Sequence, residues 1–279
     1  MIKTIKQEIN RLNVFCFDNI VYSNRLSMWG RENIQLKMNL IIPFEEKRVF
    51  KKRPTIVWLE GGGWSNSTPF YRIPELSFYA YNGFNVANVS YSVSNANIWP
   101  SCIEDAKTAI RFLRANSDKY GIDENNIFVA GESAGAHLAA MIGLCDKYKT
   151  DEYIEYSDNV NGVITFYCPG DFVEANSGDS LNSCGSRLLG QDIYNNLDLL
   201  KEISPTEYVK ENEPPFLMFH GDKDNVVDVN CSINLHNKLV EKGNICDLYI
   251  LKDAEHAAFE FSELNVQNKV LDFLKTYIK

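Results

Sequence analysis

Residues 126–144 read NIFVAGESAGAHLAAMIGL, an apolar strand followed at once by a glycine-flanked serine and a helix. A serine on such a strand-to-helix turn projects its hydroxyl clear of the sheet, and the turn is tight enough to need small residues around it. The pattern Gly-x-Ser-x-Gly is weak by itself, so its place between a strand and a helix is what makes it specific. We predict that Ser133 is a nucleophile.

Short apolar strands and helices alternate along most of the chain around this motif. The first segments alternate apolar and polar residues, as antiparallel strands do, and the later ones read as repeated strand–helix units. This order predicts an α/β fold with one mixed, mostly parallel sheet of about eight strands and helices on both faces. The expected strands are 14–22, 34–42, 55–59, 85–91, 127–130, 163–167, 216–220 and 247–251, and the expected helices are 102–120, 134–144, 229–242 and 263–277.

The stretch 171–203 interrupts the alternation, because it is polar and reads as irregular. Connections of that length in a compact domain are usually functional or disordered, so we predict a small lid or pocket-wall insertion. No repeat, linker or low-complexity tract marks a boundary, and residues 1–279 are therefore expected to form a single domain.

Composition and charge exclude several classes of function. A net charge of −9 over 279 residues argues against nucleic acid or an anionic membrane surface as the main partner. Seven scattered cysteines without a C-x-x-C pair favour reduced thiols in a cytosolic protein over disulfides or a zinc site. A charged N-terminus and the lack of a long apolar run favour a soluble, cytoplasmic protein without a signal peptide. We expect no metal or other cofactor, and the sequence does not specify an oligomeric state.

A serine nucleophile needs a base, and the chain has only four histidines. His256 lies between the last expected strand and the last expected helix, where it is free to reach over the carboxyl edge of the sheet. His137 lies one helical turn past Ser133 and points along the helix, which favours a packing role. His220 ends a strand and is interpreted as bonded to nearby backbone, and His236 as a surface or core-edge residue in mid-helix. We therefore predict His256 as the base.

The acid that orients this base should lie between the two in the chain, at the end of a strand. The segment 220–227, HGDKDNVV, fits that position. We assign Asp224 as the acid. Asp222 is expected to shape the turn and Asp228 to start or cap the next helix.

The loop Glu60-Gly61-Gly62-Gly63-Trp64 directly follows the strand 55–59. Successive glycines allow backbone N–H groups to converge on one point, as a developing oxyanion requires. Its place after an early buried strand favours an oxyanion hole, completed by the N–H of Ala134, over a plain flexible loop.

These motifs and several others occur in an order that is typical of one family. The chain resembles the α/β-hydrolase esterases related to hormone-sensitive lipase and, more closely, the bacterial acetyl-xylan and feruloyl esterase-like group. The resemblance spans about residues 15–278. It rests on GGGW at 61–64, WPS at 99–101, AIRFLRAN at 109–116, KYGID at 119–123, GESAGAHLA at 131–139, ISP at 203–205, PPFL at 214–217 and HGDKDNVV at 220–227.

The resemblance implies a serine carboxylesterase that works through an acyl-enzyme on Ser133, on esters with short or aromatic acyl groups, such as acetyl or feruloyl groups on carbohydrate. The implied partner is a small-molecule or oligosaccharide ester. Candidates for the pocket wall are Trp64, Tyr167, Cys168 and the segment 171–203. The implied catalytic residues are Ser133, Asp224 and His256, and the implied oxyanion donors are Gly62, Gly63 and Ala134.

Two positions depart from the family pattern. Glu60 replaces the histidine that usually opens the glycine loop, and Glu255 replaces the glycine that usually precedes the final histidine. A carboxylate about 4–5 Å from the oxyanion would repel it by roughly 3–4 kcal/mol at an effective dielectric near 20. We therefore expect the Glu60 side chain to turn away from the acyl site and to accept hydrogen bonds from backbone N–H groups.

Three other functions are alternatives to an esterase, and the sequence argues against two of them. An arylformamidase or amidase uses the same three catalytic residues and a similar loop. A non-catalytic binding module would be expected to lack one of the three, and none is missing. A peptidase of the prolyl-oligopeptidase type usually adds a β-propeller, for which 279 residues leave no room.

Overall fold

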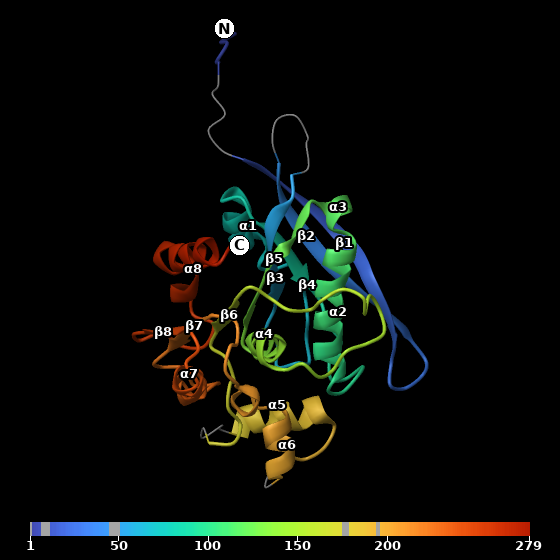
Figure 1. Ribbon diagram of the computed structural model, residues 1–279, viewed down its shortest axis with the longest axis vertical. Helices are drawn as coiled ribbons and strands as arrows, with labels where there is room; N and C mark the ends of the chain where they lie inside the picture. Colours follow the sequence, from blue (N-terminus) through green and yellow to red (C-terminus); the bar gives the residue numbers. More distant parts are fainter. Residues whose placement is uncertain (1, 7–11, 45–50, 175–178, 194–195) are drawn as a thin grey trace.

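The structure is a computed structural model that describes residues 2–6, 12–44, 51–174, 179–193 and 196–279. Its described strands form one eight-stranded sheet with the order β1-β2-β4-β3-β5-β6-β7-β8 (Figure 1). The β1–β2 and β2–β4 pairs are antiparallel and the remaining pairs are parallel, which confirms the predicted mixed sheet. The strands are β1 (Asn13–Leu26), β2 (Asn33–Phe44), β3 (Arg53–Leu59), β4 (Asn85–Val89), β5 (Ile122–Glu132), β6 (Val163–Phe166), β7 (Phe216–Gly221) and β8 (Cys246–Leu251).

Helices cover both faces of the sheet because its central strands are apolar on both sides. In β3, Val57 and Leu59 belong to a core that includes α2 and α4, while Ile56 and Trp58 belong to a second core with α1 and α8. The described helices are α1 (Ile73–Tyr81), α2 (Ser101–Ala115), α3 (Ser117–Tyr120), α4 (Ala134–Leu144), α5 (Asp179–Leu189), α6 (Leu197–Glu202), α7 (Asn230–Glu241) and α8 (Leu264–Thr276), with 3-10 turns at Pro205–Tyr208 and Phe259–Ser262. Among these described segments no helix is long and apolar enough to cross a membrane.

The segment 171–203 differs most from its prediction, because it contains α5 and α6 rather than irregular chain. The α5 sequence is rich in serine, asparagine and glycine, which are poor helix formers, so its pattern does not predict a helix. Burial of Leu188 and Leu189 stabilises it. Figure 1 shows α5 and α6 together at one end of the molecule. Residues 175–178 and 194–195 of the predicted lid lie outside the described residues.

Two smaller differences concern helices. The expected helix 102–120 is divided into α2 and α3 at Asn116. Helix α1, which follows the glycine loop, has no counterpart in the prediction because its aromatic residues, such as Phe78 and Tyr79, obscure the helical period.

The carboxyl ends of four parallel strands bring the predicted site residues to one edge of the sheet. Leu59 of β3 pairs with Gly131 of β5, so the glycine loop and Ser133 emerge side by side. The chain after β7 carries Asp224 and the chain after β8 carries His256. In open α/β sheets this edge is where ligands bind.

Candidate active site

Ser133 lies on a strained turn between β5 and α4. Its backbone has φ 50° and ψ −120°, and its N–H donates to the carbonyl of Phe166 at 2.9 Å. A Cβ at Gly135 would lie 2.0 Å from the Leu59 carbonyl oxygen, and one at Gly131 would lie 2.4 Å from the Gly135 carbonyl oxygen. Both glycines of the motif are therefore required by close backbone packing.

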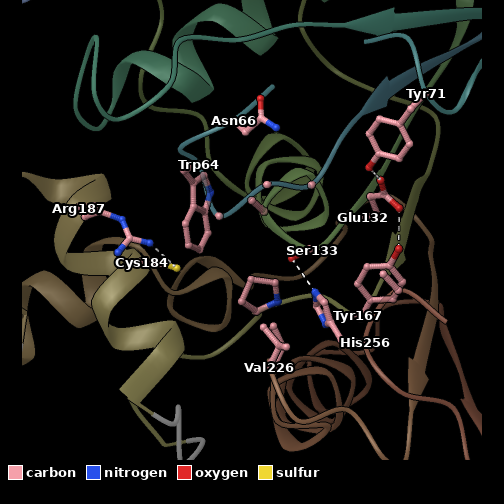
Figure 2. Close-up of a pocket in the computed structure, with 17 residues that line it drawn as sticks. Trp64, Asn66, Tyr71, Glu132, Ser133, Tyr167, Cys184, Arg187, Val226 and His256 are labelled. Atoms are coloured by element: carbon pink, nitrogen blue, oxygen red, sulfur yellow. Dashed lines mark hydrogen bonds between the residues drawn. The ribbon is translucent and has the colours of Figure 1, made fainter. Parts of the chain in front are cut away.

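The structure brings the three predicted catalytic side chains together. His256 Nε2 lies 3.1 Å from Ser133 Oγ, and His256 Nδ1 lies 2.7 Å from Asp224 Oδ2 (Figure 2). The histidine occupies a turn in which Asp253 and Ala257 both have positive φ. This geometry suits proton transfer from a serine hydroxyl to a histidine that a carboxylate orients.

Asp224 is held more firmly than its place in a loop suggests. Its Oδ1 accepts from the N–H groups of Val226 and Val227, both at 2.9 Å, and its Oδ2 lies 3.2 Å from His220 Nε2. Burial alone would raise the pKa of Asp224, but hydrogen bonds from His220, His256 and the backbone hold it well below its usual value. The carboxylate is therefore ionised and fixed beside His256.

The other acids of this loop lie where the sequence places them. Asp222 Oδ1 accepts from the N–H of Asp253 at 2.6 Å, and Asp228 Oδ1 accepts from the N–H of Asn230, the first residue of α7, at 2.8 Å. Neither takes part in the contact with His256 that Asp224 makes.

The remaining histidines occupy supporting positions. His137 is buried, bonds the Ile203 carbonyl through Nε2 at 2.7 Å, and has its pKa lowered to about 4 by burial. His220 bonds Ser232 Oγ at 2.7 Å and a backbone carbonyl, so both of its ring nitrogens have hydrogen-bond partners. Because Nε2 also lies 3.2 Å from Asp224 Oδ2, His220 helps to hold that carboxylate in place. His236 is partly buried beside Cys246.

Ser133 opens into a cavity of about 550 Å³. The glycines of the loop and Ala134 line this cavity together with Ser133 and His256. Gly62 has φ +134°, and a Cβ there would lie 2.5 Å from the Asn66 carbonyl oxygen, so only glycine fits. Gly62, Gly63 and Ala134, the predicted oxyanion donors, therefore line the same cavity as Ser133. Among the described residues, no group of three or more His, Cys, Asp or Glu side chains could hold a metal ion.

Two of the three predicted pocket residues line the cavity. Trp64 and Tyr167 do so, and Trp64 packs edge-on against His137 with ring centroids 5.1 Å apart. Cys168 is fully buried in the core instead, and the neighbouring Pro169 faces the cavity, which corrects the prediction for Cys168. From the segment 171–203, α5 supplies cavity-lining residues, so this part of the expected insertion forms a pocket wall.

Sequence reasoning missed a buried network around Glu132, the residue before Ser133. Its carboxylate accepts from Arg72 Nη2 at 2.6 Å. It also accepts from the Tyr167 hydroxyl at 2.6 Å and from the Tyr71 hydroxyl (Figure 2). Burial would raise the pKa of Glu132, but the Arg72 guanidinium and the two phenols lower it overall. The Tyr167 ring packs against His256, with centroids 4.7 Å apart, so the network supports the histidine from the side.

Glu60 is fully buried and does not line the cavity. Its Oε1 accepts from Asn88 Nδ2 at 2.7 Å, whereas its Oε2 has no partner in hydrogen-bonding geometry. The Arg72 backbone is close enough to lower the pKa of Glu60. Burial nevertheless raises the pKa of Glu60 to about 7. The side chain turns away from the acyl site as predicted, but its main donor is a side-chain amide rather than the backbone of the glycine loop.

Comparison with known families is consistent with this site. Residues 38–239 match the sequence profile of the BD-FAE family, which is more than half of the chain. The chain belongs to the BD-FAE family. Among curated relatives of this BD-FAE chain, esterase LipC of Mycobacterium tuberculosis is 34% identical over 188 residues, which cover 64% of this chain and 46% of LipC. The chain spans about half the length of the curated relatives it matches.

Solved structures show the same fold as this BD-FAE chain. A truncated carbohydrate esterase from gut microbiota aligns with a TM-score of 0.79 and 23% identity, covering 94% of this chain and 96% of that one. The propionate-bound esterase 2 of Thermogutta terrifontis aligns with a TM-score of 0.74 and 25% identity, covering 93% and 92%. The α/β-hydrolase fold expected from the sequence is therefore confirmed.

Proposed function

We propose that this chain is a serine carboxylesterase whose acyl-enzyme forms on Ser133. The observation that carries the proposal is the continuous hydrogen-bond chain from Ser133 Oγ through His256 to the buried, ionised Asp224, at the wall of a cavity. Membership of an esterase family and the name of LipC support it.

In the proposed reaction, Ser133 Oγ attacks the ester carbonyl carbon while its proton passes to His256 Nε2. The carbonyl oxygen becomes an oxyanion and accepts hydrogen bonds from the N–H groups of Gly62, Gly63 and Ala134. The alcohol then leaves with the proton from His256. Water attacks the acyl-enzyme with the same histidine as base, which releases the acid and restores Ser133. Asp224 stabilises the transient imidazolium.

We propose short or aromatic acyl esters, including acetyl or feruloyl esters of carbohydrate, as substrates. The cavity of about 550 Å³ has the size of an ordinary small-molecule site. The related Thermogutta esterase was solved with propionate, a short acid. The three catalytic residues would also serve an arylformamidase, so N-formylkynurenine is the comparison substrate.

The test is hydrolysis of 4-nitrophenyl esters from acetate to decanoate, methyl ferulate, acetylated xylan and N-formylkynurenine. We expect the esters to be cleaved faster than the formamide. Ser133→Ala should lower kcat by several orders of magnitude and abolish labelling by a fluorophosphonate, because nucleophile and base act as a unit. Asp224→Asn should be severe and Asp222→Asn mild. Labelling of a serine other than Ser133, or faster cleavage of the formamide, would contradict the proposal.

A further inference from the structure

Arg187 lies in the last turn of α5 and lines the cavity with an exposed side chain. Its Nη1 donates to Ser183 Oγ at 3.1 Å and its Nη2 to Cys184 Sγ at 2.9 Å. Neither partner is a carboxylate. Within the described part of the chain, no acidic side chain forms an ion pair with this guanidinium.

The charge of the rest of the cavity wall makes this arginine distinctive. Glu132 is the one acidic residue among those that line the described cavity, and Arg72 already pairs with it at 2.6 Å. Among the side chains that the structure describes, no carboxylate therefore cancels the positive charge of Arg187, although the chain as a whole has a net charge of −9. A cation in this position attracts an anion that arrives from solution.

The guanidinium also lies near the glycine loop of the site. Cys184 Sγ, which accepts from Arg187, lies 3.3 Å from the point where a Cβ on Gly63 would stand, so a single sulfur atom separates Arg187 from the glycine loop. Figure 2 shows Arg187 on the Trp64 side of Ser133, opposite Tyr71 and Glu132. A substrate bound at Ser133 can place a polar group on either side, and this side carries the unpaired charge.

We propose that Arg187 binds an anionic group of the substrate, and that the preferred substrates are esters which carry a second, ionised carboxylate. The planar guanidinium matches a carboxylate through two parallel N–H···O bonds, and its present partners leave other donors unused. The charge of the Glu132 carboxylate is offset by the Arg72 guanidinium 2.6 Å away, which reduces its repulsion of an incoming anion. The inference rests on the proposed esterase function and defines its substrate class.

Matched pairs of neutral and anionic esters test this inference. Mono-4-nitrophenyl adipate and 4-nitrophenyl hexanoate place the difference in the acyl group. 4-Acetoxybenzoate and 4-acetoxybenzamide place it in the alcohol. The two members of a pair differ in intrinsic reactivity, so the quantity to compare is each variant's kcat/KM relative to wild type on the same ester.

We expect Arg187→Gln to lower kcat/KM for the anionic member of at least one pair by about 10- to 100-fold, chiefly through KM, because a hydrogen bond to a charged group is lost. The neutral member should change less than about twofold. Arg187→Lys should retain part of the preference, and Arg187→Glu should reverse it. The wild-type preference should weaken as NaCl is raised, whereas Arg187→Gln should show no such dependence.

Arg31→Gln is the matched control, because Arg31 is exposed in the connection between β1 and β2 and does not line this cavity. It should leave the ratio between the members of each pair unchanged. Equal effects of Arg187→Gln on neutral and anionic esters in both pairs would overturn the inference, while Ser133-dependent hydrolysis would leave the proposed function standing. Failure of all four esters to show Ser133-dependent hydrolysis would overturn the proposed function and the inference with it.

Discussion

Glu60 directly follows β3 and Glu132 is the last residue of the neighbouring strand β5, so the two are at equivalent positions, since Leu59 pairs with Gly131. Each immediately precedes a part of the proposed machinery, the glycine loop in one case and Ser133 in the other. Both side chains are buried, with exposed fractions of 0% and 3%. Their partners differ, because Glu132 accepts from a guanidinium and two phenols whereas Glu60 accepts from one amide.

The difference shows that donors, rather than burial alone, set the charge of a buried carboxyl group. Burial acts on both acids in the same direction, yet the pKa of Glu132 is lowered and that of Glu60 is raised to about 7. The nearby negative charge of Glu132 further raises the pKa of Glu60. A proton on Glu60 therefore limits the negative charge beside the glycine loop at pH values below about 7.

The largest expected difference between Glu60 and Glu132 is in the stability lost when each is replaced by alanine. Glu132→Ala removes the carboxylate 2.6 Å from the largely buried Arg72 guanidinium and leaves it the more distant Glu75 at 3.9 Å. We expect this change to lower the free energy of unfolding by about 3–5 kcal/mol. Glu60→Ala should cost about 1–3 kcal/mol, because it removes one buried hydrogen bond. Urea denaturation of both variants measures the difference. A larger loss in Glu60→Ala than in Glu132→Ala would contradict this ranking.

The contributions of Glu60 and Glu132 to folding stability should change with pH in opposite directions. Glu60 binds its proton more tightly in the folded state, so its contribution is complete below its unfolded pKa of about 4.5 and is lost as pH rises through about 7. Glu132 has a lowered pKa, so its contribution is present above the unfolded pKa and is lost as pH falls.

We therefore expect Glu60→Gln to gain stability relative to wild type by roughly 1–3 kcal/mol between pH 5 and pH 8. Urea denaturation at pH 5, 6, 7 and 8 gives this difference. Asp105, whose pKa is raised to about 6, is present in both proteins and cancels from it. A flat difference across this range would show that Glu60 does not titrate there.

Activity should be less sensitive than stability to Glu60. The side chain does not line the cavity, and glutamine keeps its shape and an acceptor for Asn88, so kcat of Glu60→Gln should change by less than about tenfold. Steady-state rates on 4-nitrophenyl acetate test this. A loss beyond about a thousandfold with the fold intact would mean that the carboxyl group takes part in the chemistry.

The smallest effect is expected for Tyr167→Phe. Phenylalanine keeps the ring that packs on His256 and removes one of three donors to Glu132, so the loss should be about 1 kcal/mol of stability and a few-fold in kcat. Thermal unfolding and steady-state kinetics on the same preparation measure both. Tyr167→Ala is the control, because it removes the ring as well and should reduce kcat further.

Local patterns predicted the parts of the molecule that depend on neighbouring residues. The strand, turn and helix around Ser133 form one continuous segment, and the predicted helix 134–144 matches α4 at both ends. The order of serine, acid and histidine along the chain selected Asp224 and His256, which the structure places in contact. Each of these predictions rests either on a pattern within a few neighbouring residues or on the order of elements along the chain.

The missed features depend on residues that are distant in the sequence. The Arg72–Glu132 pair joins residues 60 positions apart, and no spacing rule connects them. Helix α5 is held by tertiary burial of Leu188 and Leu189 against a weak intrinsic preference. Cys168 was misplaced because the backbone after β6 turns at Tyr167, which has a positive φ, and directs the cysteine into the core.

The close packing of Gly131 and Gly135 against neighbouring backbone divides the site into a part that mutation can reshape and a part that it cannot. Any side chain at these two positions collides with a carbonyl group of the sheet or the turn, so a change there alters the nucleophile and the fold together. The parts of the wall formed by the exposed side chains of Arg187 and Val226 carry no such constraint. Directed evolution toward new esters should therefore vary these walls and leave the turn untouched.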